Sequence, residues 1–289
     1  MKKLATWTRP LGAAVCGAVL FAAAFTAQAD WDPGQPAKWV QLPDLDFTGL
    51  DVLASFVANP QPSEPPFVNK ILADDFLCTS PDKVTDIHIW GSWLDDIEVD
   101  PALLSFHLSI HSDVPAAQNP DGFSKPGEQL WFATMAPTSA RVHYTAQEQF
   151  FDPNSGQIIG TDTLVWQYNF IIPEADAFAQ QGTRDDPVVY WLDVQALVPA
   201  DEQGLPQPLW GWKTSREHWN DDAVFGHTDQ FSQPGIGDWS ELRYPLGHPF
   251  EGQSIDLAFV ITPEPRTYAT VAGIGLVGFV IIRRFRSRR

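Results

Sequence analysis

A two-residue alternation of apolar and polar side chains is the feature that most limits how this chain folds. Over residues 163–172 one face would carry only apolar side chains, namely Leu164, Trp166, Tyr168, Phe170 and Ile172. Residues 188–198 repeat this pattern. Successive side chains of a β-strand point to opposite faces of a sheet, so the period predicts strands. Further strands are expected at 84–90, 104–110, 130–135, 141–150 and 254–261.

The segments between these strands are rich in turn-forming residues. Proline accounts for 25 of 289 residues, and residues 119–122 and 152–156 combine Pro, Asn, Asp and Gly. No segment of the central body shows a convincing amphipathic-helix period. We therefore expect an all-β fold, a two-sheet sandwich of jelly-roll type over residues 71–262. Residues 30–70 are expected to form an N-terminal arm that lies over a sheet or adds an edge strand.

Residues 1–29 have the layout of a secretory signal peptide. Lys2, Lys3 and Arg9 precede an apolar stretch at 11–25, and the segment ends in Ala27-Gln28-Ala29. Small residues at these positions are what signal peptidase cleaves after, so we expect Sec export and a mature chain that begins at Asp30. The alternative, an uncleaved anchor helix, fits less well with the polar, proline-rich residues that follow.

The C-terminus combines three ordered features. The triplet Pro263, Glu264 and Pro265 precedes an uncharged apolar segment at 268–282, and an arginine cluster at 283–289 follows, with Arg283, Arg284 and Arg286 nearest the segment. A helix of this length spans about 22 Å, short of the ~30 Å hydrocarbon core, but long basic side chains extend its reach. The positive-inside rule keeps the arginines in the cytoplasm and the body outside.

This tail resembles the PEP-CTERM sorting signal of exported Gram-negative bacterial proteins, which has the same triplet, apolar helix and arginine cluster. The resemblance covers only residues 263–289. It implies that exosortase, a membrane-embedded cysteine enzyme, acts on the chain near Pro263–Pro265 and releases or transfers it outside the cell. An ordinary tail anchor in the inner membrane is the alternative.

The body between these ends is strongly acidic. Without the three basic residues of 1–29, and without the six arginines and one glutamate of 263–289, the chain keeps 9 basic and 35 acidic residues. This charge argues against nucleic-acid partners, and it would repel anionic polysaccharide unless divalent cations bridge the two. Acidic pairs at 74–75, 95–96, 185–186 and 221–222 are expected in loops or at strand ends. A structural calcium ion is considered at Asp221 and Asp222, and solvated loop carboxylates are the simpler alternative.

Tryptophan is the second excess of the composition. Trp90, Trp93, Trp166 and Trp191 follow strand alternation and are expected in the core. Trp210, Trp212 and Trp219 instead lie among charged residues in a segment of weak alternation. Aromatic surfaces beside polar groups hold sugar rings, so these three are a candidate carbohydrate contact, with loop-anchoring tryptophans as the alternative.

Catalytic signatures are absent from the sequence. His107 and His111 would lie on one strand face about 13 Å apart, too far to share a metal ion. His218 and His227 flank the pair at 221–222, but no zinc motif, GxSxG, P-loop or Rossmann pattern accompanies them. Cys78 is the only cysteine left after the signal peptide and is expected to be a small buried residue. No catalytic residue and no required cofactor are assigned.

Residues 71–78 leading to 87–93, and residues 211–214 with 218–225, resemble an uncharacterised domain family of secreted, surface-sorted bacterial proteins, over roughly residues 35–262. The resemblance implies no activity. We expect a non-enzymatic protein of the cell surface or exopolysaccharide biofilm matrix, whose body is a structural or binding module. The alternative is a secreted glycan-acting hydrolase, which would need two carboxylates about 5–10 Å apart.

Overall fold

The computed structural model describes residues 30–58, 68–97, 99, 103–198, 208–228 and 239–262. This part of the chain is all β, and its helical elements are short 3-10 turns such as η1 (Leu94–Asp96) and η3 (Ala116–Gln118). The all-β prediction is confirmed. The expected signal peptide, sorting triplet, tail helix and arginine cluster lie outside the described residues. Within the described ranges, no helix is long and apolar enough to cross a membrane.

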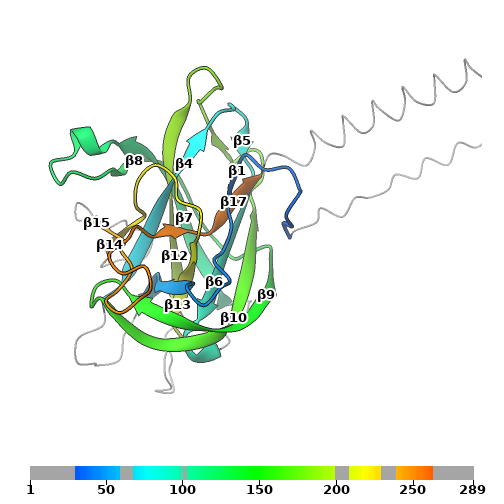
Figure 1. Cartoon of the computed structure of the whole chain (residues 1–289). Helices are drawn as coiled ribbons and strands as arrows, with labels where there is room; N and C mark the ends of the chain where they lie inside the picture. Colours follow the sequence, from blue (N-terminus) through cyan, green and yellow to red (C-terminus); the bar gives the residue numbers. More distant parts are fainter. Residues whose placement is uncertain are drawn as a thin grey trace, which may run out of the picture.

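The strands form two large sheets and a small ribbon (Figure 1). Sheet 1 has the order β1 (Trp39–Gln41), β17 (Phe259–Thr262), β6 (Asp86–Trp93), β10 (Gln157–Ile171), β9 (Ser139–Asp152), β2 (Leu50–Leu53), β13 (Trp210–Ser215) and β16 (Asp256–Leu257). Sheet 2 has the order β15 (Ser240–Glu241), β14 (Val224–His227), β4 (Lys70–Cys78), β12 (Val188–Val198), β7 (Ser105–Val114) and β8 (Lys125–Met135), with β3 (Ser55–Val57) parallel to β12. The ribbon pairs β5 (Lys83–Val84) with β11 (Phe178–Ala179).

The two large sheets share one apolar core. Phe106 of sheet 2 packs edge-on against Phe170 of sheet 1, with ring centroids 5.4 Å apart, and Phe76 packs in the same way against Phe259 at 6.1 Å. Fully buried aliphatic side chains from both sheets fill the space around these rings. Each large apolar side chain removed from water stabilises the fold by about 1.5–3 kcal/mol, so this shared core is the main source of stability.

Five strands of sheet 1 close into a ring. Besides the pairings along the sheet, β13 also pairs with β6, so β6, β10, β9, β2 and β13 form a closed circuit. Three register shifts in the β9–β10 hairpin bend it, and Figure 1 shows both strands as long curved ribbons. Gly91 permits the close approach, because a Cβ there would lie 2.3 Å from the Gly211 carbonyl oxygen. Side chains that point into the ring are therefore buried by the strands themselves.

The predicted strands with clear alternation are confirmed. The range 188–198 coincides with β12, and the ranges 141–150 and 163–172 overlap the longer β9 and β10. The boundary of an N-terminal arm at residue 70 is wrong, because 30–70 supplies β1, β2 and β3 to both sheets. β1 is the edge strand considered from the sequence, whereas β2 lies in the interior of sheet 1 between β9 and β13.

Candidate functional site

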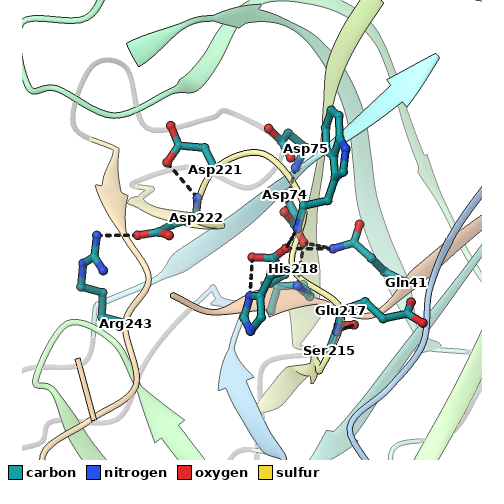
Figure 2. Close-up of polar contacts among 12 residues, drawn as sticks. Gln41, Asp74, Asp75, Ser215, Glu217, His218, Asp221, Asp222 and Arg243 are labelled. Carbon is teal, nitrogen blue, oxygen red and sulfur yellow. Dashed lines mark hydrogen bonds and ion pairs between the residues drawn. The ribbon is translucent and has the colours of Figure 1, made fainter. Parts of the chain in front are cut away.

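A buried pair of carboxylates lies between the two sheets (Figure 2). Asp74 lies in β4, on the face that also carries Leu72 and Phe76 of the core, and Asp256 begins β16. Their relative exposures are 0% and 1%. The sequence placed Asp74 and Asp75 in a loop or at a strand end, and this is wrong. Both faces of β4 are buried, so its acidic residues lie within a strand that shows no polar alternation.

Amide groups satisfy the oxygens of the Asp74–Asp256 pair. Asp74 Oδ2 accepts hydrogen bonds from the Gln41 side chain at 3.0 Å and from the Leu257 backbone at 2.6 Å. Asp256 Oδ2 accepts from the Trp219 backbone at 2.8 Å, and the Gln41 amide reaches it at 3.5 Å. Gln41 therefore bridges the two carboxyls, and Figure 2 shows its amide beside Asp74.

The pKa values in this cluster are raised. Burial raises the pKa of Asp74 well above its usual value, and the charges of Asp256 and Asp75 raise it further. Burial raises the pKa of Asp256 to about 6, even though the Trp219 amide and His218 act against it. Burial also raises the pKa of neighbouring Asp75 to about 8. At neutral pH a pKa of about 8 keeps Asp75 largely protonated, whereas a pKa of about 6 leaves Asp256 mostly ionised, so the cluster does not carry three full charges.

An aromatic rim, defined as Trp39, Trp219 and His218, lies over this pair. The Trp39 and Trp219 rings meet edge to face with centroids 4.9 Å apart, and both are half-buried. The His218 side chain is 47% exposed, and its Nδ1 lies 3.3 Å from Asp256 Oδ1. Exposed Glu217 lies next to the rim in the chain and accepts a hydrogen bond from the Leu42 backbone. The site thus joins an accessible aromatic surface to a buried acid pair whose pKa values are raised.

Only one of the three tryptophans proposed for carbohydrate contact lies at this surface. Trp210 and Trp212 are completely buried, so the prediction that they contact sugar is wrong. β2 and β6 pair with the two edges of β13, and the side chains on both of its faces are buried. Trp210 packs against Phe106 at 5.1 Å, and the Trp212 indole donates a hydrogen bond to the Ala258 carbonyl. Alternation could not predict this burial, because a strand that is buried on both faces shows no polar alternation.

The acidic pair Asp221 and Asp222 forms a separate group with Glu241. Carboxylate oxygens of these three residues lie within 4.8 Å of one another, close enough to surround one cation. Arg243 already occupies this position, with Nη2 2.6 Å from Asp222 and 2.8 Å from Glu241 (Figure 2). Asp221 instead accepts a hydrogen bond from the Ser124 backbone. The calcium ion considered from the sequence stays a prediction, and it would compete with an arginine.

The remaining candidates lie in sheet 2, where His107, His111 and Cys78 are buried and His227 is exposed. His107 and His111 both approach the Asp193 carboxylate of β12, at 3.8 and 2.9 Å. Burial lowers the pKa of His107, whereas the hydrogen bond and charge of Asp193 outweigh burial and raise the pKa of His111. Cys78 is buried, as predicted, and its thiol donates to the Ser80 carbonyl. His227 lies in β14 with its ring near Phe225, apart from the rim.

Fold and site together define an all-β domain with buried acid clusters and an aromatic surface. The chain belongs to the family described as "Domain of unknown function (DUF7901)", whose family model matches residues 37–262. No curated protein and no solved structure matches the chain. The matched residues are nearly those, roughly 35–262, over which the sequence resembles an uncharacterised domain family. The family has no assigned activity.

Proposed function

We propose that this chain is an exported protein of the cell surface or exopolysaccharide matrix, with residues 30–262 as a non-enzymatic structural or binding module. The observation that carries the proposal is the pairing of the first and last strands, in which Trp39 lies opposite Ile261. Both ends of the body therefore lie at one edge of sheet 1. The last strand ends at Thr262, directly before the Pro263-Glu264-Pro265 triplet, so a tail at that point would hold or release a finished domain.

Contacts of Asp30 support a mature chain that begins there. Its carboxylate accepts a hydrogen bond from the Asn169 amide at 2.7 Å and lies 3.4 Å from Arg141 Nε. Residue 30 thus already takes part in the fold, as expected if signal peptidase cleaves after Ala29. The shared core of the two large sheets supports, for the whole body, a two-sheet sandwich of jelly-roll type.

The aromatic rim is the part of the surface that we propose for binding polysaccharide. Trp39 and Trp219 offer apolar ring surface, and His218 and Glu217 offer hydrogen-bonding groups beside it, which is the combination that holds a sugar ring. The acidic body would approach an anionic polysaccharide through bridging divalent cations. Exopolysaccharide is therefore the proposed partner of the body, with the Sec machinery and exosortase as partners during export.

A secreted glycan hydrolase is the second candidate. The raised pKa values of Asp74 and Asp256 favour it, because a carboxyl that keeps its proton can serve as a general acid. The burial of both carboxyls argues against it, since a catalytic acid must touch the glycosidic oxygen. Incubation of the purified protein with a polysaccharide panel separates the two functions. Retention on the polysaccharide without chain shortening supports the module, and chain shortening supports the hydrolase.

Sorting is tested by intact-mass spectrometry of membrane and medium fractions, in cells with and without the exosortase. We expect a species that begins at Asp30 and ends within Pro263–Pro265 only where the enzyme is present. Replacement of Pro263, Glu264 and Pro265 by alanine should abolish this species, whereas Pro249→Ala, in an exposed turn, should not. Recovery of residues 30–289 from the membrane of both strains would contradict the sorting proposal.

A further inference from the structure

The closed ring of sheet 1 contains a second buried cluster of ionisable groups. Lys213 of β13, Asp51 of β2, Glu148 of β9 and Asp162 of β10 all point into it, and none is more than 4% exposed. Their carboxylate oxygens lie within 4.8 Å of one another although the strands are not all neighbours. Such proximity follows from the curvature of the ring. The cluster is separate from the aromatic rim and does not depend on the proposed function.

Lys213 and Asp51 are held against each other by the backbone. They lie directly opposite in the antiparallel pairing of β13 with β2, although 162 positions separate them in the sequence. Lys213 Nζ lies 3.4 Å from Asp51 Oδ2 and also donates a hydrogen bond to Glu148 Oε2. Glu148 in turn lies opposite Asp162 across β9 and β10. An amine and a carboxyl are thus fixed at contact distance inside the protein.

The cluster has too few hydrogen-bond donors for its oxygens. Asp51 Oδ1, Glu148 Oε1 and both oxygens of Asp162 have no hydrogen-bond partner of normal geometry. Burial raises the pKa of Glu148 to about 7 and that of Asp162 to about 9. Protonated carboxyls therefore lie beside the Lys213 amine at neutral pH. Formation of an amide from an amine and a carboxyl requires an acid that can both donate and accept a proton.

The chain closes tightly over the amine. A Cβ on Gly49 would lie 2.7 Å from Lys213 Nζ and 2.2 Å from the Asp44 carbonyl oxygen, so only glycine fits there. Asp51 and Lys213 are both 0% exposed. Exclusion of water favours condensation over hydrolysis, because water is the product of the one and the reactant of the other.

We propose that Lys213 and Asp51 condense into an intramolecular isopeptide bond, with Glu148 as the residue that transfers the protons. In the reactive state the Lys213 amine is neutral and the Asp51 carboxyl is protonated. The amine nitrogen attacks Asp51 Cγ and forms the carbon–nitrogen bond. Glu148 gives its proton to the departing Asp51 hydroxyl, which leaves as water, and takes a proton from Nζ. One amine and one carboxylic acid become one amide and one water, and Glu148 returns to its starting state.

Proton transfer within the cluster must precede this attack. Burial acts to lower the pKa of Lys213, yet the charges of Asp51 and Glu148 raise it, so the resting amine holds a proton. Its transfer to Asp51, directly or through Glu148, turns the buried ion pair into the neutral pair from which the amine can attack. The amide formed is also neutral, and its carbonyl oxygen can accept a hydrogen bond from protonated Glu148 or Asp162. The bond thus removes the formal charges of Lys213 and Asp51. It also gives a hydrogen-bond partner to carboxyl groups of Glu148 and Asp162 whose oxygens otherwise have none.

Such a bond would join β2, near the start of the body, to β13, near its end. The mature chain keeps a single cysteine and so has no internal disulfide available. A second use of the same acids, the binding of a divalent cation, is less well supported, because the Lys213 ammonium already contacts two of the three carboxylates. The mass of the protein distinguishes these two states.

The test is intact-mass spectrometry of the purified full chain or its exported form under denaturing conditions, followed by protease mapping. The chain is expected to weigh one water molecule less than its sequence, and one linked peptide pair should contain Asp51 and Lys213. A chain of full mass, with or without a metal lost on denaturation, would overturn the proposal. A link from Lys213 to Glu148 would overturn the assignment of Asp51 as the acceptor.

Two variants test the roles of the residues. Glu148→Gln keeps the shape of the side chain but cannot transfer a proton, so it should restore the full mass while the protein still folds, as judged by circular dichroism. Lys70→Arg is the matched control, because Lys70 is also buried and lies 3.0 Å from a carboxylate, that of Asp152. This variant should keep the loss of one water. Glu148→Gln that still loses one water would overturn the role of Glu148.

Discussion

The two buried acid clusters of this molecule are neutralised in different ways. In the ring cluster a buried amine, Lys213, contacts two of three carboxyls, and four carboxylate oxygens lack a hydrogen-bond partner. Between the sheets, Asp74 and Asp256 instead receive hydrogen bonds from Gln41 and from backbone amides. The difference teaches that buried carboxyls can be held mainly by amide hydrogen bonds, without a buried amine. A buried amine beside carboxyls brings reactive partners together as well as neutralising charge.

Removal of the amine should have the largest effect. Lys213→Met removes the proposed bond to Asp51 and leaves Asp51 and Glu148 buried without the amine. Loss of one partner of a buried ion pair alone costs about 3–5 kcal/mol of unfolding free energy, so a loss of at least this size is expected. Urea unfolding followed by tryptophan fluorescence measures this loss. Lys125→Met removes a more exposed pair with Asp121 and should cost no more than about 1 kcal/mol. Equal losses in the two variants would show that the ring cluster does not need its amine.

Loss of the bridging amide should come next. Gln41→Leu takes a hydrogen-bond donor from both Asp74 and Asp256, and a buried acceptor left without its donor costs about 1–3 kcal/mol. The same urea unfolding measures it, with Gln129→Leu on exposed β8 as the control. An unchanged unfolding free energy would mean that the retained protons alone stabilise the acid pair.

Both clusters should make the protein more stable in acid. Folded-state pKa values of about 6 for Asp256, 8 for Asp75 and 9 for Asp162 exceed the usual value of 3.8, so the folded state holds more protons in this interval. The unfolding free energy should therefore fall as pH rises from 4 to 9, by at most about 1.4 kcal/mol per pH unit for each group. Unfolding at several pH values measures the slope.

Isosteric variants show how much each cluster contributes to the change of unfolding free energy with pH. Asp75→Asn should flatten it between about pH 4 and 8, and Asp162→Asn should flatten it up to about pH 9, because neither amide titrates. A slope unchanged in both variants would contradict the raised pKa values.

The rim should give the smallest change in stability and the clearest change in binding. Trp219→Ala removes an aromatic pair worth about 0.5–1.5 kcal/mol beyond its buried area. It should also abolish retention on the polysaccharide that binds the unaltered protein. Tyr144→Ala, an exposed aromatic of β9, serves as the control and should bind normally. Loss of binding in both variants would place the contact elsewhere.

The sequence predicted those strands whose two faces differ in polarity, because their apolar and polar side chains alternate. β12 was predicted with its full extent, since its apolar residues alternate. β4 and β13 were not predicted, because both of their faces are buried and their side chains show no period of two. The same cause placed Asp74 in a loop and Trp210 at the surface. Trp219 was singled out as a candidate carbohydrate contact and lies half-buried at the rim, but its partner Trp39 was not singled out, since only the fold brings them together.

By itself the sequence determined the all-β class, the acidic body and the layout of its two ends, because these depend on composition and on short-range order. Only the tertiary structure decided which charged residues meet. Lys213 and Asp51 are 162 positions apart, and the closure of five strands into a ring makes them neighbours. The physical reason is that alternation and charge are local properties of a chain, whereas burial and the pKa shifts that follow from it depend on strands distant in sequence.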